Sequence, residues 1–116
     1  MYAHPRGTLP GRPRAALLES LGALVMAEGI SHIVVGLPLD MTGEEGERAR
    51  KTRGVAQAIA DATRCEVELW DERLTTVQAR AALRMADVRG PRASALVDEA
   101  AAVTILQSWL DWRAAR

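Results

Sequence analysis

The 116-residue sequence has few of the residues that form covalent cross-links or soft-metal sites. Cys65 is its only cysteine, which excludes an internal disulfide bond. His4 and His32 are its only histidines, so a structural zinc site would have too few nitrogen and sulfur ligands. Any metal ion bound by this chain would therefore depend on carboxylates.

The sequence also lacks a long apolar run and an excess of charge of one sign. No stretch approaches the roughly 18 consecutive apolar residues of a membrane span, and the start contains no apolar segment like that of a signal peptide. We therefore expect a cytoplasmic protein that makes no membrane contact. The 15 Lys+Arg balance the 15 Asp+Glu, which argues against a general polyanion binder, because such proteins carry a basic excess. Nearly all the cations are arginines, which suit phosphate well, although a high-GC coding bias explains them more simply.

Apolar spacing predicts helices that alternate with strands. Leucines and valines at helical spacing predict an amphipathic helix over Arg14–Glu28, which Gly29 ends. The run His32–Leu37 predicts a strand buried on both faces, and Glu66–Trp70 predicts a half-exposed strand nearer a sheet edge. The other expected elements are helices over about Glu47–Thr63, Thr75–Ala86 and Ser94–Arg113 and, at most, a short edge strand over Ala3–Leu9.

This order of elements predicts a single α/β unit. Two strands separated by a helix favour a parallel pair joined by a right-handed crossover. Because a sheet normally needs three or more strands for independent stability, we expect that strands are missing or are supplied by a partner.

Residues that follow the two predicted strands are the first candidates for a site, because ligands of open parallel sheets bind beyond the carboxyl ends of the strands. The loop Gly36–Asp40 follows one strand, and Asp71–Thr76 follows the other. The second segment combines two carboxylates with a guanidinium, which could hold a divalent cation and orient a phosphate. The plainer interpretation is an exposed charged turn that leads into a helix capped by Thr75 and Gln78.

Asp98 is the other candidate. It lies on the apolar side of the last predicted helix, and the small side chains of Ala101 and Ala102 would leave room beside it for an ion or a phosphate. A carboxylate on such a face needs a partner. The alternative is an acid near the helix start at Ser94, where the helix dipole favours it. His32, at a strand start, is expected to be structural.

Three segments in this order resemble one protein family. They are Val34–Gly43 (VVGLPLDMTG), Asp71–Thr76 (DERLTT), and Val97–Ala102 (VDEAAA) followed by Ile105-Leu106-Gln107. From about Ala3 to Asp111 the sequence is similar to the YqgF/RuvX family, bacterial proteins described both as Holliday junction resolvases and as pre-16S rRNA nucleases. The resemblance implies a ribonuclease-H-like α/β fold in three layers, with a mixed sheet flanked by helices.

The resemblance further implies a metal-dependent endonuclease that hydrolyses phosphodiester bonds in branched DNA or precursor rRNA. Carried over by motif, Glu72 and Asp98 would be catalytic residues and ligands of Mg²⁺ or Mn²⁺. Asp71 and Arg73 would support them, Thr75 would cap a helix, and the loop Gly36–Gly43 would lie along the substrate path. Cations that could contact phosphates are Arg48, Arg50, Lys51 and Arg53 on one helix, and Arg80, Arg84, Arg89 and Arg92 around the turn before Asp98.

The sequence departs from the family at its start. Family members begin with a strand that carries an Asp-x-Gly motif and the central metal ligand, whereas the first aspartate here is Asp40. In the first motif, Asp40 and Thr42 stand where the family usually has asparagine and aspartate. We therefore expect residues 1–116 to be a single, N-terminally truncated ribonuclease-H-like domain without its first two strands, and to be a weak nuclease or none.

Two further expectations follow from this departure. The alternative function is that of a non-catalytic module that binds nucleic acid or protein. The unpaired strand edge at His32–Leu37 is a template for pairing between chains, so we expect at least a homodimer.

Overall fold

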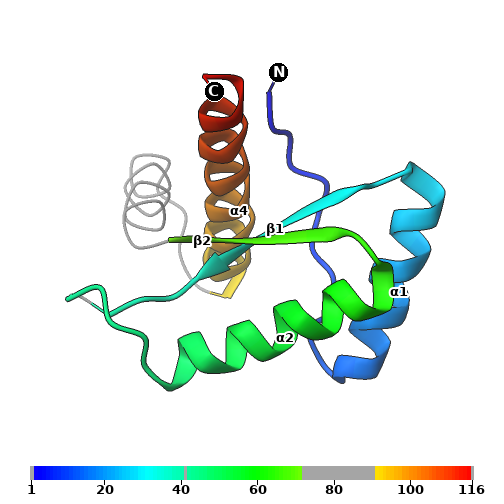
Figure 1. Ribbon diagram of the computed structural model, residues 1–116, viewed down its shortest axis with the longest axis horizontal. Helices are drawn as coiled ribbons and strands as arrows, with labels where there is room; N and C mark the ends of the chain where they lie inside the picture. The colour runs from blue at the N-terminus through cyan, green and yellow to red at the C-terminus, as the bar shows by residue number, and fades with distance from the viewer. Residues whose placement is uncertain (1, 41, 72–90, 116) are drawn as a thin grey trace.

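The computed structural model describes residues 2–40, 42–71 and 91–115, with the side chains of the last range described from Asp98 onward. The elements are α1 (Arg14–Glu28), β1 (His32–Leu37), α2 (Glu47–Thr63), β2 (Glu66–Asp71) and α4 (Pro91–Ala114). Figure 1 shows the two strands crossing the middle of the molecule, with α4 and α2 on opposite sides of them. The predicted α/β class is confirmed. Within these ranges no helix has both the length and the apolar character that crossing a bilayer requires.

The strands β1 and β2 form a parallel pair. Their register runs from His32 opposite Glu66 to Leu37 opposite Asp71, which confirms the predicted direction of pairing. Because the strands are parallel, their carboxyl ends lie together at one end of the sheet. The loop that follows Leu37 therefore begins next to Asp71.

Each face of the sheet packs against a different helix, because successive side chains of a strand point to opposite faces. His32 of β1 and Glu68 of β2 contact Trp109 of α4, whereas Val67 and Leu69 line a cavity together with residues of α2. The buried apolar residues are few, and they are Leu37, Ala49, Ala56, Ile59, Cys65, Ala101, Ile105 and Trp109. The last three lie along one side of α4.

One edge of β1 is open in the described structure. The carbonyl of Ser31 accepts a hydrogen bond from the N–H of Glu66 at 3.1 Å. By the alternation of parallel pairing, the backbone groups of Ile33, Val35 and Leu37 face β2, whereas those of His32, Val34 and Gly36 face away from it. No described backbone group bonds to this outer set.

An apolar groove of about 330 Å³ runs along the open edge of β1. Its walls include Leu21 and Val25 of α1, Val34 of β1, and Ala102 and Ile105 of α4. Of β1, only Leu37 is buried, and the other strand residues are half-buried. The prediction of a strand buried on both faces is therefore wrong. In the described structure β1 has a neighbouring strand on one edge only, so its side chains are partly exposed to the groove along the other edge.

The helix α1 has the predicted bounds, and it ends at Gly29, whose φ of 64° is left-handed. No α1 side chain is buried, because its apolar side faces the open groove rather than a packed neighbour. The N-terminal segment, residues 2–12, forms no strand, so the predicted edge strand over Ala3–Leu9 is wrong. No described strand lies beside this segment to pair with it.

The other differences concern boundaries. β2 extends to Asp71 instead of Trp70. α4 begins at Pro91 rather than Ser94, which agrees with the preference for proline at the first helical position. The predicted helix over Thr75–Ala86 lies outside the described residues.

Candidate functional site

The predicted site residues divide into those that the structure describes and those that it does not. Asp71 is exposed at the carboxyl end of β2, and Asp98 is exposed on α4. The residues Glu72, Arg73, Thr75, Arg80, Arg84 and Arg89 lie outside the described ranges, as does the side chain of Arg92. The geometry of the site is therefore defined from Asp98 and its surroundings.

Asp98 continues the sheet-facing stripe of α4 toward the start of that helix. Ala101, Ile105 and Trp109 are the buried residues of this stripe, and Asp98 lies one turn before Ala101 and Ala102 on the same side. It is the eighth residue of α4, and no acid lies in the first turn. Since the dipole effect fades within the first turn, the interpretation of Asp98 as a helix-start acid is not supported.

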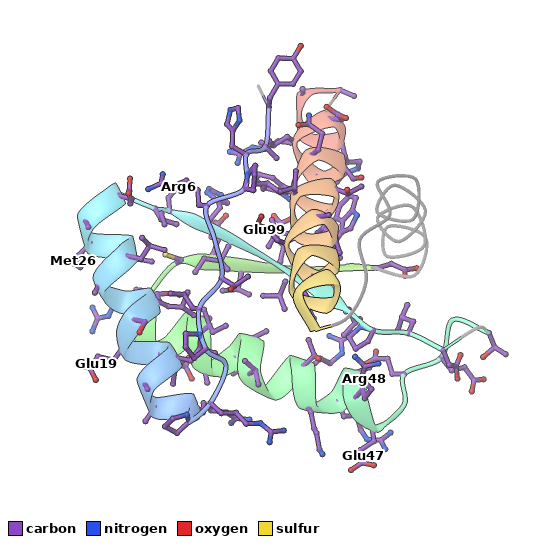
Figure 2. All side chains as sticks on the ribbon, turned by 180° about the vertical axis from the view of Figure 1, so that it is seen from behind. Arg6, Glu19, Met26, Glu47, Arg48 and Glu99 are labelled. Carbon is purple, nitrogen blue, oxygen red and sulfur yellow. The ribbon has the colours of Figure 1, made fainter. Side chains whose placement is uncertain are left out.

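A cavity of about 190 Å³ lies beside Asp98. One wall belongs to α4 and includes Asp98, Glu99 and Ala102, and the opposite wall is the N-terminal stretch from His4 to Thr8. Figure 2 shows Arg6 on the N-terminal segment and Glu99 on the adjacent part of α4. The expectation that small residues leave room next to Asp98 is confirmed for Ala102.

Two contacts hold the N-terminal segment in place. The backbone N–H of Ala3 donates to Oε1 of Gln107 on α4 at 2.8 Å. At the other side, the guanidinium of Arg6 pairs with the carboxylate of Glu28 on α1 at 3.0 Å. The segment thus spans from α4 to α1, and its residues His4 to Thr8 form one wall of the cavity.

The described residues do not assemble a metal site by themselves. In the three described ranges, no group of three or more His, Cys, Asp and Glu side chains is placed to hold a metal ion. Asp98 is one of the two predicted metal ligands, and the other, Glu72, lies outside these ranges. Asp98 is therefore the one predicted metal ligand whose surroundings the described ranges define.

The loop after β1 is organised by the Asp40 carboxylate. Its Oδ1 accepts hydrogen bonds from the Thr42 hydroxyl at 2.6 Å and from the backbone N–H groups of Thr42 and Glu44, both at 2.9 Å. The Thr42 hydroxyl, followed by the Glu44 N–H, holds the pKa of Asp40 below its ordinary value. The two residues that depart from the family motif thus build this turn together.

Two of the four predicted phosphate-contacting cations of α2 are paired with acids of the same region. The Lys51 ammonium lies 3.4 Å from Glu47. The Arg53 guanidinium donates two hydrogen bonds to the Glu45 carboxylate, which raises the pKa of Arg53 and lowers that of Glu45. Arg48 and Arg50 form no ion pair with any described residue.

These four cations do not form one patch. At about 100° per residue, their side chains leave α2 in different directions, and Figure 2 shows Glu47 and Arg48 pointing to different sides of the helix. The structure brings none of them to Asp98 through a contact that it describes. Their predicted role in phosphate contact stays a prediction.

His32 lies at the amino end of the sheet, away from the strand ends that carry Asp71. Its Nε2 is 2.7 Å from Glu66, its Nδ1 is 2.9 Å from the Ser31 hydroxyl, and its ring centroid is 5.9 Å from that of Trp109. These contacts join β1, β2 and α4, as expected for a structural histidine.

The comparison with known proteins decides the family. A family model described as RuvX, Holliday junction resolvase, matches residues 1–112. The chain belongs to the RuvX family. Its α/β arrangement is consistent with the ribonuclease-H-like fold of that family.

Similar proteins come from several bacteria. A protein of Pelotomaculum thermopropionicum is 46% identical over 99 residues, which are 85% of this chain and 64% of the relative. One of Myxococcus xanthus is 45% identical over 94 residues, or 81% of this chain and 62% of the relative. One of Chloroflexus aggregans is 39% identical over 111 residues, or 96% of this chain and 78% of the relative. Each is named "Putative pre-16S rRNA nuclease".

The match covers less than two thirds of the length of the first two relatives.

Residues that the sequence patterns missed are His4, Arg6 and Thr8, which form the cavity wall opposite Asp98. Their only signal in the sequence is a start that contains arginine and no acid. Local pattern could not place that start against α4, because the contact joins residues about a hundred positions apart.

Proposed function

We propose that this chain acts in the hydrolysis of phosphodiester bonds in structured nucleic acid, with Glu72 and Asp98 as the carboxylates that hold Mg²⁺ or Mn²⁺. The observation that carries the proposal is the position of Asp98, an exposed carboxylate on an otherwise apolar stripe, beside a cavity. RuvX membership and the names of the relatives support a nuclease. Branched DNA and precursor rRNA are the proposed substrates, and the bacterial cytoplasm is the proposed location.

The residues of the chain have separate roles in this proposal. A divalent ion, when bound, supplies activation of water and neutralisation of the leaving oxygen. Asp98 presents its carboxylate from a long helix, and Asp71 and Arg73 support Glu72 at the end of β2. The turn built by Asp40 and Thr42 lines the substrate path beyond β1.

Cleavage of a labelled four-way DNA junction and of a precursor 16S rRNA fragment in Mn²⁺ tests the proposal. We expect Glu72→Gln and Asp98→Asn to remove any cleavage shown by this chain or by a version extended upstream with the Asp-x-Gly strand. Glu99→Gln, which changes the neighbouring acid of the same cavity, is the matched control and should retain it. Cleavage that survives Asp98→Asn contradicts the proposal. Binding without cleavage, both by this chain and by the version extended upstream, supports the alternative, a non-catalytic binding module.

We also propose that full activity needs a further strand on the open edge of β1, where the family resemblance places its Asp-x-Gly strand. The unpaired backbone groups of His32, Val34 and Gly36 and the adjacent groove support this. The cleavage assay on a version that carries such a strand upstream tests it. Equal cleavage rates for the two versions would contradict the requirement.

In the absence of such a strand, we propose that a second copy of the chain pairs with this edge to give a homodimer. An unpaired edge bordered by apolar surface favours strand addition between chains. Light scattering at micromolar concentration should give a dimeric mass, and Val34→Lys, which puts a charge into the groove, should give a monomer. Glu19→Lys on the exposed surface of α1, outside the groove, is the control and should stay dimeric. A monomeric mass for the parent chain overturns this proposal.

A further inference from the structure

The charge of the chain is balanced overall but not along its length. Residues 1–18 contain Arg6, Arg12 and Arg14 and no Asp or Glu, the first acid being Glu19. With 15 cations and 15 acids in the whole chain, the remainder holds 12 cations against 15 acids. The start therefore has a net charge of +3, and the rest has −3.

The structure places this basic start against the acidic end of α4. The stretch from His4 to Thr8 forms the wall of the 190 Å³ cavity that faces Asp98 and Glu99. It presents an imidazole, a guanidinium and a hydroxyl, which are side-chain groups that donate hydrogen bonds to phosphate oxygens. The contacts of Ala3 with Gln107 and of Arg6 with Glu28 fix its path.

The cations of this segment are available to a ligand, as are Arg48 and Arg50 of α2, which are also exposed and have no described ion pair. Arg12 and Arg14 are exposed and form no ion pair with the described residues. The partner of Arg6 is a surface carboxylate, with the two side chains 76% and 44% exposed, and surface ion pairs of this kind contribute little. A phosphate could replace Glu28 at small cost, whereas the Arg53 guanidinium is held by two hydrogen bonds to Glu45.

We propose that residues 4–14 form the surface along which the phosphate backbone of a nucleic-acid substrate passes Asp98, with Arg6 as the phosphate contact next to the cavity. This rests on the proposed nuclease function and names the part of the chain that holds its substrate. Apart from the phosphate that a bound cation would draw to Asp98, the phosphates of the backbone are repelled from the α4 wall by the carboxylates of Asp98 and Glu99. The backbone is therefore held on the opposite, N-terminal wall.

Binding of a fluorescein-labelled four-way DNA junction, measured by fluorescence anisotropy over a salt series in EDTA and again in Mg²⁺, tests this surface separately from cleavage. We expect Arg6→Gln and Arg12→Gln each to weaken binding about fivefold to tenfold. Each should also reduce the slope of log K against log salt by about one.

Two variants serve as controls. Glu28→Gln removes the same ion pair as Arg6→Gln but leaves the guanidinium free, so it should bind as well as the parent chain or more tightly. Arg64→Gln removes an exposed cation at the end of α2 that is not among the predicted phosphate contacts, and it should change the affinity less than about twofold.

The outcomes separate the two proposals. If Arg6→Gln and Glu28→Gln weaken junction binding equally, Arg6 acts only by holding the N-terminal segment to α1 through its ion pair with Glu28. That result would overturn this inference. A larger effect of Arg64→Gln than of Arg6→Gln would place the surface at the end of α2 and overturn it as well. If the chain binds through Arg6 but neither it nor the version extended upstream cuts either substrate, this surface stands and the proposed nuclease function is refuted. A chain that binds no junction at low salt refutes both.

Discussion

The indole N–H of Trp109 donates a hydrogen bond to the carboxylate of Glu68 at 2.5 Å, joining α4 to β2. Trp109 is 4% exposed, and the Arg113 guanidinium lies 5.0 Å from the centroid of its ring. The bond fixes how α4 lies on the sheet. Since Asp98 is on the same helix, its position depends on this distant anchor.

Trp109→Phe should destabilise the protein by about 1–3 kcal/mol, because it removes a hydrogen bond to a charged group and leaves Glu68 without that donor. The free energy of unfolding in urea measures the loss. Glu68→Gln keeps an acceptor for the indole, so its effect should be smaller. A double-mutant cycle with Trp109→Phe and Glu68→Leu should give a coupling above about 0.5 kcal/mol. Additive effects would show that the hydrogen bond does not anchor α4.

Acid should weaken the loop between β1 and α2. Hydrogen bonds from Thr42 and Glu44 lower the pKa of Asp40, and the Arg53 guanidinium lowers the pKa of Glu45. A carboxyl whose pKa is lower in the folded than in the unfolded state adds stability above its unfolded pKa, and this stability is lost as the pH falls through the folded pKa. The contribution should therefore be constant above about pH 5 and fade below about pH 4. Both groups are exposed, so it should be small.

Glu45→Gln isolates one of these contributions. Urea unfolding of the parent chain and of this variant from about pH 7 to pH 2 should show a difference that shrinks toward zero at the acidic end. Glu44→Gln, which changes an exposed acid whose carboxylate has no described ion pair, is the control and should show little pH dependence. A difference for Glu45→Gln that does not vary with pH would contradict the assignment.

Ala102→Leu should obstruct the candidate site without unfolding the protein. Ala102 is exposed and lines the cavity beside Asp98, so a larger side chain enters open space rather than a packed core. The free energy of unfolding should change by less than about 0.5 kcal/mol, while junction binding and cleavage fall. Ala115→Leu, at the exposed end of the chain, should leave both properties unchanged. Normal binding by Ala102→Leu would show that substrate does not enter this cavity.

Two glycines of α1 should respond in opposite ways to alanine. Gly22 lies inside the helix, and a Cβ there would meet nothing within 4 Å, so Gly22→Ala should stabilise the protein by about 0.5–1 kcal/mol. Gly29 ends the helix at a φ of 64°, where a Cβ is strained, so Gly29→Ala should destabilise by about 1–2 kcal/mol. Thermal unfolding of both variants checks the sign. Stabilisation by Gly29→Ala would contradict the left-handed cap.

The sequence predicted those features that depend on local signals. Leucine spacing and Gly29 define α1, and charges that alternate with Val67 and Leu69 identify β2 as a half-exposed strand. Asp98 was recognised because it is a carboxylate within an apolar stripe. All of these signals lie within a few residues of the feature that they define.

Features that depend on distant neighbours were not predictable in this way. The apolar run of β1 indicates a strand, but its burial depends on whether both edges are covered, and one edge is open in the described structure. The path of His4 to Thr8 beside α4 depends on contacts with Gln107 and Glu28. No local spacing encodes these contacts.

The amide protons of β1 belong to two kinds that alternate along the strand. Those of Ile33, Val35 and Leu37 face β2, whereas those of His32, Val34 and Gly36 face the groove. Because hydrogen exchange requires a free amide, every second amide of a monomer should exchange with deuterium rapidly and the intervening ones slowly. A strand or a second copy that pairs with this edge would slow the rapid set, so deuterium uptake at these positions reports directly whether the sheet has been extended.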